Sequence, residues 1–232
     1  EILIHDDVST DGATDIVRDY QSRYPRLIKA NIPEKNQYSQ GLRPGAALRA
    51  SAQGEYLAIC EGDDYWTDPL KLQKQVDYLK ENTGYSGVVT NGKVIGLWDK
   101  RIGSSESDYD IKLNDVVFHR PFQTASFLVR KKVIDALARL PDGWVSGDLW
   151  IFAGCTTFGC LRYFEEVSHV YRKHEGGVSM SYGSKSVRSE IEGLNTARGV
   201  PFRMRYLILA ALNHKMLIRD FCTTRGEYIS CF

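Results

Sequence analysis

The chain has 232 residues, which is enough to bury a core of its own as one large domain or as one domain with an appendage. Its formal net charge of +1 argues against a nucleic-acid-binding protein that relies on bulk positive charge. No apolar run is long enough to span a bilayer, and no signal peptide is recognisable. These features favour a globular protein without a nucleic-acid partner.

The cysteines favour a reducing compartment. There are five, an odd number, and their spacing matches no pattern of metal ligands. They are Cys60, Cys155, Cys160, Cys222 and Cys231. We therefore expect reduced, mostly buried thiols in a cytoplasmic protein.

The first sixty residues alternate between strand-like and helix-like segments. The predicted elements are a strand over 1–5, a helix between Asp11 and Pro25, a strand over 26–32, a helix over 44–53 and a buried central strand over 56–60. This alternation is typical of a parallel sheet covered by helices. Right-handed crossovers would bring the ends of the first and third strands to one edge. We therefore expect Asp6 and Asp7 to share a crevice with the acidic residues of 61–64.

The second part of the chain continues this pattern with longer loops. The predicted elements are helices over 69–81 and 131–140, strands over 85–89, 122–129 and 162–172, and a polar, mobile excursion over 96–114. The helix over 69–81 is expected to bury Leu72, Val76 and Leu79 and to turn its lysines outward. The tail from Asn195 alternates basic and apolar residues, which suits a helix packed on the domain or lying on an anionic membrane surface.

Acidic side chains mark two positions in this part. Glu61, Asp63 and Asp64 directly follow the strand over 56–60, where open α/β sheets bind ligands, and a divalent cation or its phosphate complex would relieve their repulsion. A solvated turn that caps the next helix is the alternative, but it leaves these three carboxylates unexplained. Asp148 stands at the start of an apolar helix, where the helix dipole favours a carboxylate, so capping is its simplest role.

Four runs of the sequence, in this order, resemble family 2 glycosyltransferases of the GT-A fold: IHDDVSTDGATDIV, GEYLAICEGDDYWTDPLKLQKQVDYL, VSGDLWIF and VYRKHEGGVS. Such enzymes are nucleotide-sugar transferases of bacterial cell-surface glycan synthesis. The resemblance covers 1–181 and implies an α/β, Rossmann-like, mostly parallel sheet with helices on both faces. Residues 182–232 would then form a C-terminal helical tail.

The resemblance implies a donor site made of the acidic residues. Asp7 would meet a uracil-type base, with Asp6 beside it. Glu61 replaces the aspartate that is usual in the family at the ribose contact. Asp63, with Asp64 next to it, would be the metal ligand that bridges Mg²⁺ or Mn²⁺ to the donor diphosphate. A divalent ion would neutralise the charge that develops on the departing nucleoside diphosphate.

The resemblance also implies an acceptor side. Asp148 corresponds to the catalytic base, which takes the proton of the acceptor hydroxyl during attack on the anomeric carbon. A single base opposite a metal-held leaving group implies direct displacement with inversion. His174, with Arg172 close by, falls where family members close a loop over the diphosphate, and its imidazole could ligate the metal or bind a phosphate. An ordinary surface histidine is the alternative.

Two departures from the family pattern qualify this expectation. Family members have a strand and a helix before the strand that begins here at Glu1, so this chain is expected to lack part of its donor site. The Q-x-x-R-W element and membrane helices of processive synthases are not found, which favours addition of a single sugar. The expected function is inverting, metal-dependent transfer of one sugar from a nucleotide-sugar donor, a UDP-sugar, to a glycan or lipid-linked acceptor. The expected place is the cytoplasm or, peripherally, the inner face of the plasma membrane.

Two other function classes remain. One is a non-catalytic sugar-nucleotide-binding relative, or an inactive fragment, of the same fold. The other is a magnesium-binding phospho-acceptor domain, in which Asp6 and Asp7 would also follow a strand, although such domains are about half as long and need neither Asp148 nor His174.

Overall fold

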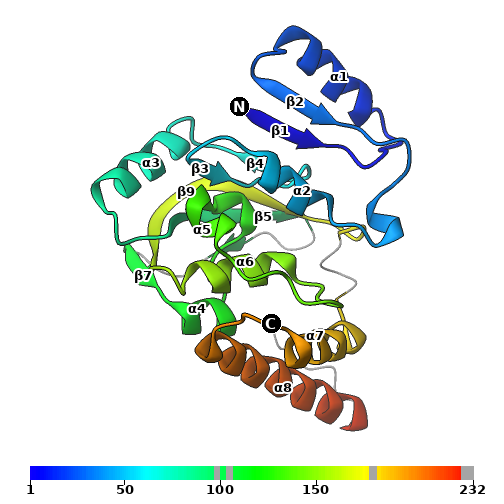
Figure 1. Ribbon diagram of the computed structural model, residues 1–232, viewed down its shortest axis with the longest axis vertical. Coiled ribbons are helices and arrows are strands. Elements are labelled where there is room, and N and C mark those ends of the chain that lie inside the picture. Colours follow the sequence, from blue (N-terminus) through cyan, green and yellow to red (C-terminus); the bar gives the residue numbers. More distant parts are fainter. Residues whose placement is uncertain (97–99, 103–106, 178–181, 226–232) are drawn as a thin grey trace. The chain divides into compact units, whose positions relative to one another are not determined.

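The structure is a computed structural model that describes residues 1–96, 100–102, 107–177 and 182–225. Contacts divide the chain into two compact units, Glu1–Leu57 and Ala58–Phe232 (Figure 1). The predicted domain division after residue 181 stays a prediction. The described residues beyond it are largely helical, as expected for the tail.

The first unit is a two-stranded parallel sheet with its helices. β1 (Ile2–His5) pairs with β2 (Ile28–Asn31), and α1 (Ala13–Arg23) connects them. A short 3₁₀ helix, η1 (Tyr38–Gln40), and α2 (Pro44–Ser51) follow. The strands and helices agree with the prediction, but α1 buries none of its residues. Ile16 and Tyr20 are exposed, because two strands offer the helix only a narrow surface and α1 packs against β2.

The second unit is built around a mixed sheet with the strand order β3-β8-β5-β9-β4, to which β6 and β7 add at β5 and β9. The strands are β3 (Tyr56–Ala58), β4 (Tyr65–Trp66), β5 (Gly87–Gly96), β6 (Lys100–Ile102), β7 (Tyr109–Ile111), β8 (Leu128–Arg130) and β9 (Leu161–Lys173). The long central pair β5–β9 is parallel, whereas β8 on β5 and β4 and β7 on β9 are antiparallel. The α/β fold class is therefore confirmed, with a sheet that is mixed rather than mostly parallel.

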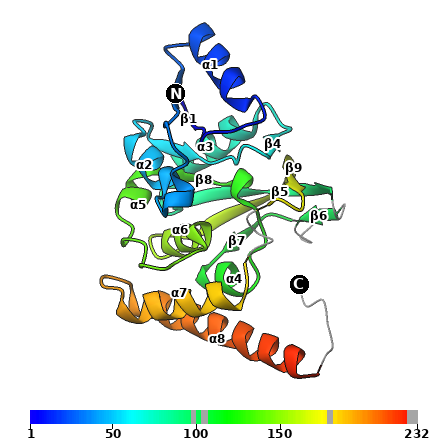
Figure 2. The same ribbon diagram turned by 90° about the vertical axis from the view of Figure 1, so that its right-hand side faces the viewer.

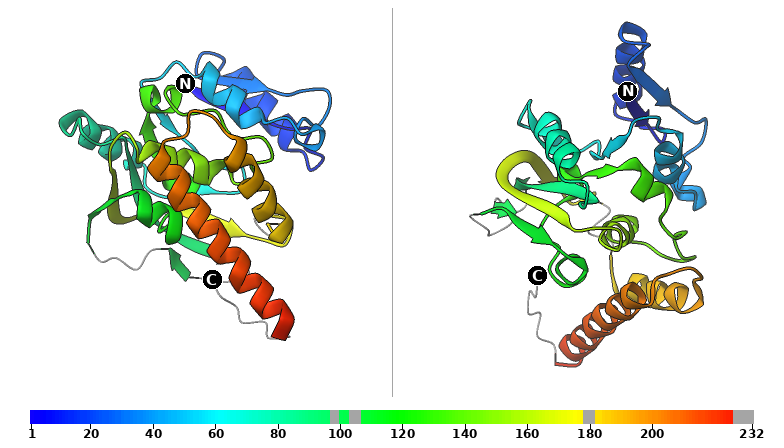
Figure 3. Two further views of the ribbon diagram at one scale, coloured as in Figure 1. Left: turned by 60° about the horizontal axis from the view of Figure 1, so that its bottom comes forward. Right: turned by 60° about the vertical axis from the view of Figure 1, so that its left-hand side comes forward.

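Helices lie on both faces of this sheet. They are α3 (Lys71–Glu81), α4 (Leu113–Phe118), α5 (Lys131–Asp135), α6 (Gly147–Cys155), α7 (Ser184–Thr196) and α8 (Phe202–Arg225). Figure 2 shows α3 on one side of β5 and β9, and α4 and α6 on the other, with α7 and α8 as a further layer beyond them. α7 and α8 lie side by side (Figure 3). Among the described residues, no helix combines the length and the apolar character that crossing a membrane requires.

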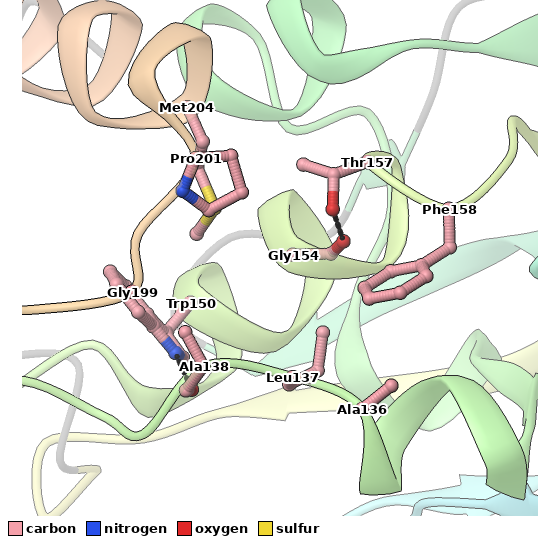
Figure 4. A pocket seen from close by; sticks show the side chains of 10 residues that line it. All are labelled: Ala136, Leu137, Ala138, Trp150, Gly154, Thr157, Phe158, Gly199, Pro201 and Met204. Carbon is pink, nitrogen blue, oxygen red and sulfur yellow. Dashed lines mark hydrogen bonds between the residues drawn. The ribbon is translucent and has the colours of Figure 1, made fainter.

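The core of this unit is aromatic and centres on α6. Phe122 and Phe127 each lie with their ring centroids 4.8 Å from that of Phe152 in edge-on geometry, and all three are fully buried. α6 is buried over the whole stretch Leu149–Cys155, which explains why it is apolar on every side. Against its outer surface and the start of α8 lies an apolar cavity of about 110 Å³, lined among others by Trp150 and Met204 (Figure 4).

α3 turns only part of its predicted face to the core. Leu79 is buried as predicted, but Leu72 is exposed, and Lys71 and Gln75 are buried in addition. The Lys71 ammonium donates a 2.9 Å hydrogen bond to Gln75 Oε1 and lies 4.7 Å from the centroid of the Trp66 ring. Burial lowers the pKa of Lys71 to about 8. A lysine can face inward here because an amide oxygen and an aromatic ring replace its water.

Other segments also differ from expectation. The predicted buried central strand over 56–60 is shorter, stands at the end of the strand order, and leaves Cys60 exposed, so the described thiols are not mostly buried. The predicted strand over 122–129 is a 3₁₀ helix, η2 (Thr124–Ser126), followed by β8. Part of the predicted excursion over 96–114 lies outside the described residues. The rest contains β7, which pairs with β9.

Candidate active site

The acidic loop between β3 and β4 is fixed by the pairing of β4 with β9. Tyr65 lies opposite Val170 and Trp66 opposite His169 in this antiparallel ladder. The same ladder therefore brings the end of β9 to the residues that precede Tyr65. Asp64 accepts a 2.9 Å hydrogen bond from the backbone N–H of Arg172, which continues the pairing by one further contact.

Asp63 and His174 form a solvent-accessible pair at this place. Asp63 Oδ2 lies 3.1 Å from His174 Nε2, and about half of each side chain is exposed. The Arg172 guanidinium holds the loop from the same side, because its Nε donates to the backbone carbonyl of Asp63 and its charge lies over the Tyr65 ring. The structure thus brings Asp63, Asp64, Arg172 and His174 together, as expected.

The pKa values of two carboxyl groups in this loop are raised. For Asp64, burial and the charge of Asp63 raise the pKa to about 6, against the opposing hydrogen bond from Arg172. For Glu61, the surrounding protein atoms raise the pKa to about 7, although part of the residue is exposed. The charges of Asp64 and Asp148 add to this rise, while a hydrogen bond with Thr124 opposes it. Glu61 is thus close enough to both the acidic loop and Asp148 for their charges to act on its pKa.

Asp148 lies in the first turn of α6 and is held on both of its oxygens. Oδ1 accepts a 2.7 Å hydrogen bond from the backbone N–H of Leu149, and Oδ2 accepts a hydrogen bond from the Arg120 guanidinium. About a third of the side chain remains exposed. The helix dipole favours a carboxylate at this place, but Asp148 is not the N-cap, which is Ser146.

The loop that leads into α6 is fixed from α7. Glu190 is fully buried, and its Oε1 accepts hydrogen bonds from the backbone N–H groups of Val145 at 3.1 Å and Ser146 at 2.6 Å. Its other oxygen accepts a 2.6 Å hydrogen bond from the Tyr182 hydroxyl. The described tail thus supports the position of Asp148, a role that its sequence did not indicate.

Asp6 and Asp7 belong to the first unit, where each carboxylate is occupied by local donors. Asp6 is buried and accepts hydrogen bonds from the N–H and hydroxyl of Ser9 and from the Thr14 hydroxyl. Burial opposes its ionisation, but these hydrogen bonds outweigh burial and lower its pKa. Asp7 accepts 2.7 and 2.9 Å hydrogen bonds from the N–H groups of Gln37 and Tyr38. Desolvation again opposes these bonds, and its pKa is lowered.

Both residues therefore order the loops that follow β1 and β2. Their contact with a nucleoside, and the crevice they would share with Glu61, Asp63 and Asp64, stay predictions, since the two groups belong to different units.

The second unit contains a ligand pair rather than a complete metal cage. Within the part of the chain that the structure describes, no three His, Cys, Asp or Glu side chains are grouped so that they could hold a metal ion. Asp63 Oδ2 and His174 Nε2 nevertheless form an accessible oxygen–nitrogen pair. Magnesium in nucleotide sites takes one or two protein ligands and completes its shell with phosphate oxygens and water. The pair fits an ion of that kind, shared with a diphosphate.

Sequence reasoning missed three residues of the site: Arg120, Thr124 and Glu190. Arg120 and Thr124 stand in the run HRPFQTAS, which has no strong periodicity, and Arg120 has a left-handed backbone with φ 41° that a sequence does not reveal for an arginine. Glu190 lies in an amphipathic helix whose polar residues suggest only a solvated face.

Two curated relatives match half of the chain or more. An uncharacterised protein of Mycobacterium bovis, Mb1547, is 32% identical over 182 residues, which are 77% of this chain and 51% of that protein. TuaG of Bacillus subtilis, named as a teichuronic acid biosynthesis glycosyltransferase, is 35% identical over 124 residues, 50% of this chain and 46% of TuaG. The chain thus spans about half the length of these relatives.

A solved structure shows the same fold. The crystal structure of S. aureus TarS 1–349 in complex with UDP-GlcNAc matches with a TM-score of 0.66 at 18% identity, covering 95% of this chain and 63% of that one. The family model "Glycosyl transferase family 2" matches residues 1–137, more than half of the chain. The chain therefore has the GT-A fold and belongs to glycosyl transferase family 2.

Proposed function

We propose that the protein transfers one sugar from a nucleotide-sugar donor, a UDP-sugar, to a glycan or lipid-linked acceptor, with inversion and with a divalent metal ion. The observation that carries this proposal is the accessible Asp63–His174 pair, beside Glu61, whose pKa responds to the charges of both Asp64 and Asp148. TarS, with the same fold, was crystallised with UDP-GlcNAc, and TuaG is named for teichuronic acid biosynthesis. These names support a UDP-sugar donor and a role in cell-surface polysaccharide synthesis.

The donor would lie against the acidic loop. Asp63 and His174 would hold Mg²⁺ or Mn²⁺, which would supply positive charge to the diphosphate as it leaves. Arg172 and Asp64 would fix the loop that carries Asp63, since they join it to β9. Asp6 and Asp7 would contribute the nucleoside side from the first unit.

The acceptor would approach Asp148. Its carboxylate takes the proton of the acceptor hydroxyl while the hydroxyl oxygen forms a bond to the anomeric carbon. The bond between that carbon and the donor phosphate oxygen breaks on the opposite side, and both bonding electrons leave with the nucleoside diphosphate. One displacement of this kind inverts the anomeric centre. Asp148 is suited to this work because its carboxylate is partly exposed and held in one orientation.

A peripheral membrane position on the cytoplasmic side would suit a lipid-linked acceptor. α8 exposes two stacked aromatic rings, Phe202 at 82% and Tyr206 at 64% exposure, with the exposed cation Arg203 beside them. Aromatic and cationic side chains on one helix surface favour the interface of an anionic membrane. Sedimentation with vesicles that contain anionic lipid would test this part. If the two rings insert into the membrane interface, the Phe202→Ser, Tyr206→Ser variant should bind these vesicles more weakly than the wild type does.

The central experiment is a screen of UDP-, GDP- and dTDP-sugars for donor turnover by the full-length protein, with Mn²⁺, with Mg²⁺ and with a chelator. We expect turnover with a UDP-sugar that requires the divalent ion. Donor binding without turnover, under every condition and with polyol-phosphate and lipid-linked acceptors, would instead favour a non-catalytic relative.

A further inference from the structure

One short segment of the second unit contacts both sides of the candidate active site. At its start, the Arg120 guanidinium donates to Asp148. Near its other end, the Thr124 side chain lies close enough to Glu61 to lower the pKa of that carboxyl group. The segment 120–126 therefore lies beside Asp148 at Arg120 and beside the acidic loop at Thr124.

The end of this segment is itself fixed to the core. Trp66 Nε1 donates a 2.8 Å hydrogen bond to the backbone carbonyl of Ala125, and Gln75 Nε2 donates a 2.8 Å hydrogen bond to that of Ser126. Gln75 is fully buried and accepts from the buried Lys71. The inward lysine of α3 thus has a structural consequence, because it orients the amide that holds η2 in place.

The start of the segment is held in a backbone conformation that arginine rarely adopts. Arg120 has φ 41°, and such strain persists only where the surrounding structure enforces it. Its guanidinium lies 5.5 Å from the centroid of the buried Phe152 ring, and within the described residues its buried Nε has no hydrogen-bond partner. The backbone N–H of Arg120 donates a 2.8 Å hydrogen bond to the carbonyl of Asp115, which ends α4 with a left-handed residue. This end of α4 directs the guanidinium to Asp148, with which it forms an ion pair.

We propose that Arg120 is the positioning residue for the Asp148 carboxylate, and this rests on the proposed function of the same site. Arg120 fixes Oδ2 while the Leu149 N–H fixes Oδ1, so that neither oxygen can rotate away and each keeps a lone pair for the acceptor hydroxyl. Because the same segment bears Thr124, the base and the acidic loop are placed by one piece of backbone. Arg120 thus acts on the reaction through Asp148 and does not bind the donor.

A double-mutant cycle of sugar transfer tests this role. Arg120→Ala should lower kcat roughly 10- to 100-fold, because a small misplacement of a base is costly. The donor KM should stay within about twofold, and Arg120→Lys should restore part of kcat, since a lysine can still pair with the carboxylate. In the Asp148→Asn background, Arg120→Ala should cause no further loss. Arg162→Ala is the matched control, because the Nε of Arg162 is likewise buried and its Nη1 lies 3.1 Å from Asp110 Oδ1.

Two results would overturn the proposal. One is a kcat of the double variant that equals the product of the two single losses in kcat. The other is a rise in donor KM of Arg120→Ala as large as its fall in kcat. Thermal unfolding supplies a readout that needs no turnover. The losses in Tm from Arg120→Ala and Asp148→Asn should not add in the double variant if the two side chains are coupled, and additive losses would contradict the pairing. If the wild-type protein transfers no sugar, the proposed function fails, while this thermal cycle still decides whether Arg120 holds Asp148.

Discussion

Acidic side chains follow a strand in both units of the molecule, but the pKa values of these side chains are shifted in opposite directions. In the first unit, Asp6 and Asp7 follow β1 and are occupied by backbone and hydroxyl donors that lower their pKa values. In the second unit, burial and, to a smaller extent, the charges of neighbouring carboxylates raise the pKa values of Glu61 and Asp64. Carboxylates of the first kind hold a loop through hydrogen-bond donors of the protein itself. Those of the second kind store an electrostatic repulsion that a bound cation would relieve.

This contrast teaches that position after a strand does not by itself identify a binding carboxylate. Both pairs follow strands and both lie in runs typical of the family. The partners of each side chain separate them, and those partners are visible only in the folded chain. The variants below test the contrast, in order of decreasing expected effect.

Asp148→Asn should have the largest effect. The amide cannot take the acceptor proton, so kcat for transfer should fall by roughly 10²- to 10⁴-fold, while UDP affinity is retained. Steady-state transfer and calorimetric titration with UDP would measure the two quantities. Asp135→Asn, on the surface of α5, is the control, and undiminished turnover in Asp148→Asn would remove Asp148 from its proposed role.

Asp63→Ala should weaken the Mn²⁺-dependent part of UDP binding. Removal of one of two ligands should lower this affinity roughly tenfold or more, which corresponds to about 1.4 kcal/mol for each factor of ten. Calorimetry of UDP binding with Mn²⁺ and with chelator isolates the metal-dependent part. Asp77→Ala, on the exposed face of α3, should bind as the wild type does. Equal Mn²⁺ dependence in both variants would argue against Asp63 as a ligand.

Asp6→Asn should destabilise the first unit without any ligand present. The amide replaces a carboxylate that accepts hydrogen bonds from Ser9 and Thr14. We expect the free energy of unfolding to fall by about 1–2 kcal/mol, a value that already allows for screening by the solvent near the site. Urea unfolding followed by circular dichroism would measure it. The exposed Asp15 on α1 supplies the control Asp15→Asn. A stability equal to that of the control would mean that Asp6 does not order its loop.

The smallest expected effect is on the pH dependence of thermal stability. The contributions of the carboxylates in the two units should change with pH in opposite directions. Glu61 and Asp64 have folded pKa values of about 7 and 6, above their ordinary values. Their contribution to the free energy of unfolding is therefore present at low pH, where both are protonated, and is lost as the pH rises through 6 to 7. The difference in Tm between Glu61→Gln and wild type should grow in favour of the variant from pH 4 to pH 8, by roughly one to a few degrees, in metal-free buffer.

Asp6 provides the opposite case for the same measurement. Its lowered pKa contributes stability above the ordinary pKa of an aspartate, and this is lost as the pH falls. Asp6→Asn should therefore lose more Tm at pH 7 than at pH 3. Parallel pH profiles for Asp6→Asn and Glu61→Gln would show that the two kinds of carboxylate do not differ.

Much of this architecture could be predicted from local signals. Apolar periodicity located β1, α1, β2, α2 and β9, and the resemblance to the family singled out Asp63 and His174, which the structure places 3.1 Å apart. Those signals are local, since strands and helices depend on residues close in sequence. The mixed direction of the sheet was not predicted, because strand pairing joins segments far apart in the chain.

The supporting residues of the site could not be predicted for the same reason. Arg120 lies 28 residues before Asp148, and its left-handed backbone stands at the end of α4, where its N–H donates to the carbonyl of Asp115. Lys71 was expected to face solvent, because only the folded chain places Trp66 and Gln75 around its ammonium. Tertiary contact overrides residue preference at each of these places.

The two-residue strand β4 has a consequence for how the family can vary. Its ladder with β9 consists of Tyr65 and Trp66, and the Asp63–His174 contact lies just beyond this ladder. Because side chains alternate between the faces of a strand, one inserted or deleted residue between Asp63 and Tyr65, or between Val170 and His174, would turn one member of the pair to the opposite face. Spacing at these two places should thus tolerate less change than the identity of the residues that fill it.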